Sequence, residues 1–271
     1  MKLKPWVQSP AAFWLFAAAV LLCGLNYWGH VAPGEVHPTR GWRLAYGFAA
    51  TALMLASAVL SLRRQIMKHP LGRAHAWTQL HVYGGSLFLL LVLMHAGFRW
   101  PLGSLTRWLL LLSGWVTGSG LCGVLLQKWI PRYLTSGLEN EILYERIPEL
   151  ISEIQARTAN LLQAAGEPLR SFYDTYLAAS LRQPQPRLIY FLDIHGGIHS
   201  QLKKFEYLRG LISETDREKL AELQALYRFK LEIDAHYTLQ GALRWWVYLH
   251  VPPSLALVLL VAVHGFTIIY Y

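Results

Sequence analysis

Four histidines lie in two apolar segments, in pairs with the same spacing. His81 and His95 are fourteen positions apart in one segment, and His250 and His264 are fourteen apart in the other. In an α-helix, fourteen residues fall about 40° short of four full turns, so both members of a pair project from nearly one face. They are separated by about 21 Å along the axis, which is most of the hydrocarbon thickness of a bilayer. Each segment therefore predicts two imidazoles at two membrane depths.

The elements that must position these histidines are membrane spans. Five segments reach the length of about 20 apolar residues that a bilayer requires, and tryptophan or tyrosine lies at most of their ends. They are residues 11–28, 42–62, 77–98, 108–127 and 244–271. We expect an all-α membrane protein with five transmembrane helices, the first four within residues 1–127 and the fifth at 244–271. Its paired histidines lie in the third and fifth spans.

Residues 128–243 separate the last two spans and differ from them in composition. Fifteen of the sixteen acidic residues lie there, together with fourteen of the twenty-five basic ones. The net charge of +9 therefore belongs to the loops that flank the spans, which argues against nucleic acid as a partner. We expect a small, soluble, α-rich insertion with one strand at 187–194, followed by a turn at His195, Gly196 and Gly197. The apolar spacing after residue 219 predicts a helix that runs into the last span.

The basic residues predict the orientation of the chain. The loop at 63–76 holds four bases, whereas the loops at 29–41 and 99–107 together hold three. By the positive-inside rule, the N-terminus and the insertion are cytoplasmic, and a bacterial inner membrane is the expected location. The third and fifth spans then run in the same direction. This places His81 level with His250, and His95 level with His264.

Two imidazoles on opposite faces of a porphyrin give a six-coordinate iron that suits electron transfer. The spacing therefore predicts a di-haem bundle that holds two b-type haems. Cys23 and Cys122 form no motif for covalent haem attachment. Small residues could make room for the porphyrins or serve ordinary helix packing; they are Gly84, Gly85, Gly97, Gly114, Gly118, Gly120 and Gly123.

Other interpretations stay open at this stage. A single histidine in a span is more often a packed residue than a ligand, and a haem-free sensor or transporter could use histidines to relay protons. His195 and His199 have a spacing that suits a metal, but no third ligand is evident, and His236 has no partner before His81. Pro252 and Pro253 predict a kink just after His250.

The two H-x13-H segments resemble the membrane domain of ferric-reductase-like proteins and NADPH oxidases, and also the haem-binding helices of quinol-oxidising cytochrome b. The first resemblance implies that the third and fifth spans hold both haems, with His81 opposite His250 and His95 opposite His264. It covers about half of the chain. Those families usually append FAD and NADPH domains; we expect none after Tyr271, and the insertion lacks a Gly-rich dinucleotide motif.

We therefore expect an electron-transfer subunit of an oxidoreductase rather than a self-contained enzyme. Electrons would pass between a quinol pool or cytoplasmic donor and an extracytoplasmic acceptor. The insertion or the outer face would bind a soluble redox partner. A quinone-reactive subunit is the second expectation, because interfacial tryptophan and tyrosine side chains near a haem could line a quinone pocket.

Overall fold

The computed structural model describes residues 10–31, 40–66, 74–138, 140–210 and 212–270. Half of the basic loop that predicts the orientation, including His69, lies outside these ranges, as does His37. The first four helices are α1 (Pro10–His30), α2 (Arg40–Ile66), α3 (Ala74–Ala96) and α4 (Ser104–Gly137). Short elements follow: η1 (Tyr144–Arg146), α5 (Ile147–Gln163), α6 (Glu167–Tyr176), α7 (Ala178–Leu181), η2 (Leu188–Phe191) and α8 (Ile194–Arg209). The last helix is α9 (Glu214–Tyr270).

Five helices in the described ranges are long and apolar enough to cross a membrane, as predicted, which makes this an integral membrane protein. They are α1, α2, α3, α4 and α9. Large apolar side chains cover their outer surfaces; Trp14, Leu22 and Trp28 on α1 are all more than 60% exposed. Soluble proteins do not expose apolar patches of this extent, whereas lipid-facing helices do. The described residues contain no strand.

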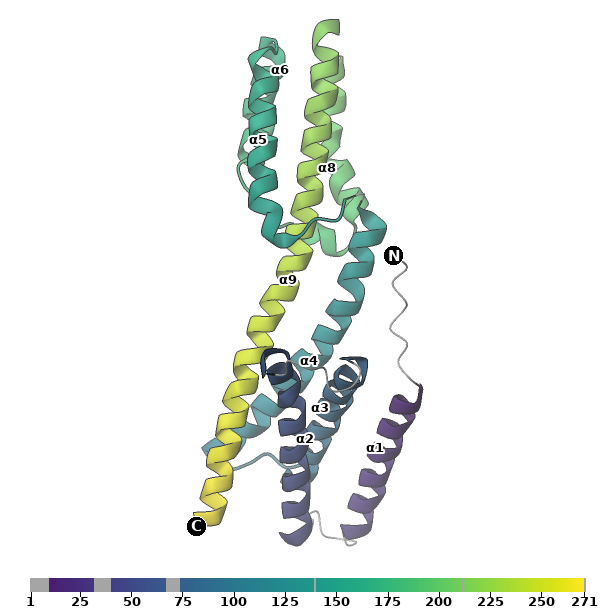
Figure 1. Cartoon of the computed structure of the whole chain (residues 1–271), viewed down its shortest axis with the longest axis vertical. Coiled ribbons are helices and arrows are strands. Elements are labelled where there is room, and N and C mark those ends of the chain that lie inside the picture. The colour runs from purple at the N-terminus through teal and green to yellow at the C-terminus, as the bar shows by residue number, and fades with distance from the viewer. Residues whose placement is uncertain (1–9, 32–39, 67–73, 139, 211, 271) are drawn as a thin grey trace. The chain divides into compact units, whose positions relative to one another are not determined.

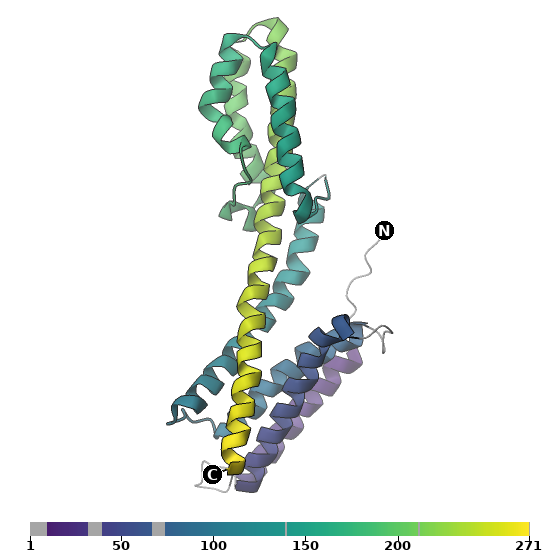
Figure 2. The same ribbon diagram turned by 60° about the vertical axis from the view of Figure 1, so that its left-hand side comes forward.

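The chain divides into two compact units, Met1–Val124 with Val247–Tyr271, and Leu125–Trp246. In the first unit, α1, α2 and α3 lie side by side (Figures 1 and 2). Its core joins α2, α3, α4 and α9 through a buried apolar cluster: Tyr46, Ala50, Met54, Phe88, Leu91, Met94, Leu109 and Leu257. The third helix ends at Gly97, whose φ of 65° reverses the chain, and the Phe98 amide then donates to the Leu93 carbonyl at 2.9 Å.

The helix α9 continues without a break through Pro252 and Pro253. Proline has no amide proton, so Pro253 leaves the carbonyl of Leu249 without its helical donor. The indole Nε1 of Trp115, on α4, donates to that carbonyl at 2.9 Å. The Ser254 hydroxyl donates to the next carbonyl, that of His250, at 2.6 Å. The indole of a neighbouring helix thus replaces one backbone bond lost to proline, as the interior of a membrane requires.

The second unit is a helical bundle with its own core. Buried side chains from every helix of the unit and from η2 meet in it, among them Ile130, Ile154, Leu169, Leu181, Tyr190, Phe205 and Leu223. The predicted strand at 187–194 is wrong. Residues 188–191 form a 3-10 turn, and α8 begins at Ile194 because the Asp193 carboxylate caps it, accepting from the Gly196 amide at 2.8 Å. The prediction that the helix after residue 219 runs into the last span is confirmed by α9.

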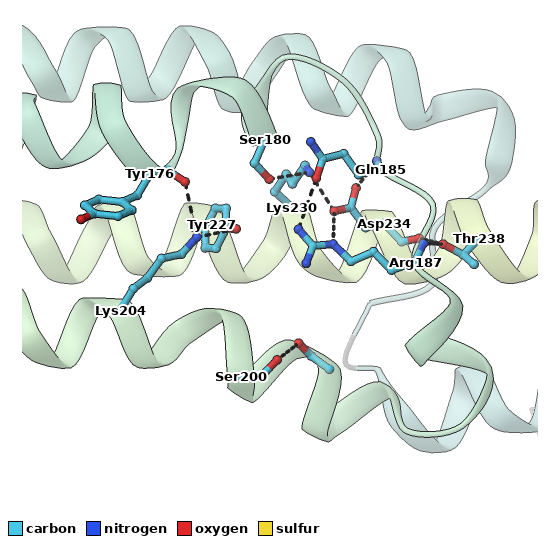
Figure 3. A network of polar contacts seen from close by, with 11 residues as sticks. Tyr176, Ser180, Gln185, Arg187, Ser200, Lys204, Tyr227, Lys230, Asp234 and Thr238 are labelled. Carbon is cyan, nitrogen blue, oxygen red and sulfur yellow. Dashed lines mark hydrogen bonds and ion pairs between the residues drawn. The ribbon is translucent and has the colours of Figure 1, made fainter.

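A charged network lies inside this bundle (Figure 3). The Lys230 ammonium and the Asp234 carboxylate are both fully buried and 2.7 Å apart. The lysine also donates to Ser180 Oγ at 3.0 Å, and the carboxylate accepts from the Gln185 amide at 2.8 Å. The buried ammonium and the buried carboxylate thus each have compensating partners, which is the condition for keeping an ion pair in a core. Burial also raises the pKa of the nearby Tyr190 phenol.

Candidate functional site: two histidine pairs in the membrane bundle

The structure brings each predicted pair of histidines together. The ring centres of His81 and His250 are 6.3 Å apart with an angle of 78° between their planes. Those of His95 and His264 are also 6.3 Å apart, at 85°. Because the earlier residue of α3 meets the earlier residue of α9 in both cases, the two helices run in the same direction here. We call them the first pair (His81 and His250) and the second pair (His95 and His264).

Three of the four imidazoles are oriented through Nδ1. His81 Nδ1 lies 3.2 Å from the Ser57 carbonyl, and His95 Nδ1 lies 2.7 Å from the Arg43 carbonyl, both on α2. A carbonyl can only accept, so these bonds place the proton on Nδ1 and leave Nε2 as the basic nitrogen. Ligating histidines generally bind a second group in this manner, which fixes the ring orientation.

His250 has a different partner. Its Nδ1 lies 2.9 Å from the hydroxyl oxygen of Ser119 on α4, and that hydroxyl lies 3.2 Å from the Val116 carbonyl, to which it donates. With its proton directed at the carbonyl, the hydroxyl accepts from the imidazole. His250 is also the most buried of the four, with 9% of its surface exposed. The helix α4 therefore orients the His250 ring through a side chain, whereas α2 orients the rings of His81 and His95 through its backbone.

Two glycines provide space for the rings. A Cβ added at Gly47 would lie 2.9 Å from His95 Nδ1, and one added at Gly120 would lie 3.2 Å from His250 Cε1. Gly120 is among the glycines that the sequence singles out, whereas Gly47 is not. Gly97 has another role, since it ends α3. An added Cβ at Gly85, Gly114 or Gly118 would meet no protein atom within 4 Å.

A buried apolar side chain lies midway between the two histidines of each helix. Phe88 is seven residues from both His81 and His95, and Leu257 is seven residues from both His250 and His264. Seven residues are nearly two helical turns, or about 10 Å, so each side chain lies midway on the histidine face. Both are buried in the same core cluster. On α3 and α9, the histidine faces thus carry a buried apolar side chain midway between the two pairs.

Aromatic side chains gather beside the second pair. His30, at the end of α1, stacks on Trp42 with ring centres 3.8 Å apart. Tyr46 is next to Gly47 in sequence, donates to the Asn26 side chain at 2.8 Å and lies 6.0 Å from the Tyr27 ring. A single stretch of α2 thus contacts both His95 and the aromatic group.

Three histidines outside the membrane bundle, His195, His199 and His236, form no comparable site. His195 and His199 are exposed on α8. His236 is buried in the second unit, where its Nε2 donates to the Asn140 carbonyl and its Nδ1 accepts from Gln240, both at 2.9 Å. Within the part of the chain that the structure describes, no three histidine, cysteine or acidic side chains come together as a metal site.

The separation of the ring centres in each pair is compatible with an iron between two imidazoles. A metal–imidazole bond of about 2.0 Å, added to about 1.1 Å from nitrogen to ring centre, gives about 6.2 Å between two ring centres across one metal ion. Both observed separations are 6.3 Å. Two axial histidines are all that a porphyrin iron needs from the protein, because the macrocycle supplies the other four nitrogens.

Comparisons with protein-family models, with curated proteins and with solved structures find no match to this chain.

Proposed function

We propose that the protein transfers electrons across a membrane through two b-type haems, one held by His81 and His250 and the other by His95 and His264. The observation that carries this proposal is the duplicated geometry: two imidazole pairs at the same 6.3 Å separation, fourteen residues apart on each of two parallel helices. When bound, a bis-imidazole haem supplies a reversible one-electron couple with no open coordination position.

The residues of this chain would hold and orient each porphyrin and exclude water from it. The carbonyls of Ser57 and Arg43 and the hydroxyl of Ser119 fix three ring orientations. Hydrogen bonds to the ligands and burial are the two means by which a protein tunes such a centre. Phe88 and Leu257 lie midway between the pairs on the histidine faces, so a proton relay in the alternative haem-free sensor or transporter would have to pass around them.

The electron donor and acceptor come from outside the chain in this proposal. A quinol pool or a cytoplasmic donor would reduce one haem, and an extracytoplasmic acceptor would oxidise the other. The insertion, placed in the cytoplasm of a bacterium together with the N-terminus, would bind a soluble redox protein. This arrangement makes the protein an oxidoreductase subunit, as the resemblance of its histidine spacing to di-haem membrane domains suggests.

Electron transfer in closed vesicles tests this function. Liposomes that contain the purified protein and trapped ferricyanide should lose the ferricyanide absorbance when dithionite is added outside, at a rate that scales with the protein content. The His264→Ala variant should lose most of this rate, whereas His199→Ala, an exposed histidine on α8, should keep it. Equal rates in wild-type and protein-free liposomes would refute the proposal.

A quinone-reactive subunit remains a second proposal, favoured by the aromatic group beside the second pair. Oxidation of a quinol releases two electrons and two protons. A haem held by the second pair would take the electrons one at a time, the His30 imidazole at the end of α1 would accept one proton, and the other proton would go to water at the membrane surface. Inhibition by quinone-site inhibitors that is lost in Trp42→Ala and kept in Trp245→Ala would support this function. Quinol that fails to reduce the haems would exclude it.

A further inference from the structure

The 3-10 turn η2 exposes large apolar side chains although it belongs to the unit that lies between the spans. Leu188 is 84% exposed and Leu192, directly after the turn, is 82% exposed. Ile189 is 46% exposed. Contiguous exposed apolar side chains of this size usually mark a contact surface. Residues 188–192 therefore form a candidate contact surface.

The turn η2 packs against the part of α4 that directly follows the fourth span. Phe191 stacks on Trp129, with ring centres 6.3 Å apart and an angle of 18° between planes. Trp129 follows Leu126, the last apolar residue of the fourth span, by three positions. The amide of Ile194, just beyond η2, donates to the Tyr133 hydroxyl at 3.2 Å. Tryptophan and tyrosine at such positions are typical of the membrane–water interface.

Contacts with the last helix, α9, place η2 at the same end of this unit. The Arg187 amide, directly before η2, donates to Thr238 Oγ1 at 3.1 Å (Figure 3). Thr238 lies six residues before Arg244, where the fifth span begins, which is about 9 Å along the helix axis. By contrast, Phe205 on α8 contacts Tyr227, which is seventeen residues or about 26 Å before Arg244. Both ends of η2 are thus tied to the membrane-proximal part of this unit.

Basic side chains lie on the same part of α4. A pocket of about 420 Å³ is lined by Leu125, Leu126, Lys128, Trp129 and Arg132. The two bases are one helical turn apart on the face opposite the buried Ile130. Neither forms an ion pair with any residue in the described ranges. Positive charge next to apolar surface at this depth matches the phosphate and the acyl chain of an anionic phospholipid.

We propose that η2 and the pocket on α4 together form a binding site for anionic phospholipid. Leu188 and Leu192 enter the boundary between headgroups and acyl chains, as the apolar face of an interfacial segment does. Lys128 and Arg132 bind the headgroup phosphate, and Trp129 connects the two parts. The site holds the insertion against the bilayer, and it does not depend on haem.

Fluorescence quenching measures this contact. In the full-length chain with Cys23→Ala and Cys122→Ala, an NBD label is placed at Leu192→Cys and, as a control, at Tyr207→Cys. Tyr207 is 79% exposed and lies near the other end of α8. The protein is reconstituted in phosphatidylcholine nanodiscs with or without phosphatidylglycerol that carries a nitroxide near its headgroup. The label at position 192 should be quenched, and the label at position 207 should not.

Charge variants then test the headgroup site. Two bases near an anionic surface favour binding by about thirtyfold, at about fivefold each. The preference of the label for nitroxide-bearing phosphatidylglycerol over phosphatidylcholine should therefore fall by that factor in Lys128→Gln with Arg132→Gln. Lys203→Gln with Arg209→Gln removes the same charge from α8 and should leave the preference unchanged. A label at position 192 that is no better quenched than one at position 207 would overturn the proposal, and would leave this surface for a protein partner.

Discussion

Replacing Gly47 with alanine perturbs one histidine pair and leaves the other intact. The new Cβ would lie 2.9 Å from His95 Nδ1 and 3.0 Å from Cε1, at least 0.4 Å inside ordinary van der Waals contact. The ring has little freedom to withdraw, because the same Nδ1 is bonded to the Arg43 carbonyl at 2.7 Å. Overpacking of this kind costs about 1–3 kcal/mol. If that cost falls on the orientation of His95, the second haem should bind about 5- to 150-fold more weakly.

Haem titration of the purified variant measures this loss. Gly47→Ala should retain one haem per chain at low haem concentration, and the remaining centre should depend on His81. Gly41→Ala is the matched control on the same helix, since an added Cβ there meets no protein atom within 4 Å. It should bind two haems like the wild type. Two haems of unchanged affinity in Gly47→Ala would refute the position assigned to His95, and loss of both haems would mean that the bundle itself fails to fold.

Three further perturbations have defined outcomes. Ser119→Ala removes the acceptor of His250 Nδ1 and should shift the midpoint potential of the first haem alone in a redox titration. Ser113→Ala, which changes a buried serine on the same helix, should shift neither potential. Two unshifted potentials in Ser119→Ala would show that Ser119 does not act on His250. Trp115→Phe leaves the Leu249 carbonyl without its donor and should lower the free energy of unfolding of the membrane unit by about 1–3 kcal/mol. An unchanged thermal midpoint would contradict the idea that the Trp115 indole replaces the amide that Pro253 lacks. Asp234→Asn removes the ion-pair partner of the buried Lys230 and should lower the free energy of unfolding, measured with denaturant, by about 3–5 kcal/mol. Glu153→Gln removes an exposed ion pair and should lower it by less than about 1 kcal/mol. Equal losses in the two variants would refute the burial argument.

The membrane helices and the histidine pairing could be predicted because both depend on periodicity. Apolar length defines a span, and a fourteen-residue interval fixes the face and depth of His81 and His95 whatever the neighbouring helices do. The same reasoning predicted that the helix after residue 219 would run into the last span. Patterns of this kind are local, so one sequence is sufficient to find them.

Features that depend on distant neighbours were missed. Gly47 lies in a helix that carries none of the paired histidines, and only the packing of α2 against α3 reveals that His95 needs the space. The roles of Ser119, Trp115 and the Ser57 carbonyl likewise depend on which helix faces which. The predicted strand at 187–194 failed because short apolar runs are ambiguous, and the Asp193 cap outweighed the turn signal of Gly196 and Gly197.

Haem stoichiometry with a reduced-minus-oxidised spectrum tests the central claim most directly. The measurement is made on purified wild type, His81→Ala and His264→Ala, with His236→Ala as a buried histidine outside the pairs. The account predicts two b haems per wild-type chain, about one in each of the first two variants, and two in the third. The absence of a Soret band from wild-type protein that was expressed with sufficient haem would contradict the account and favour a haem-free sensor or transporter.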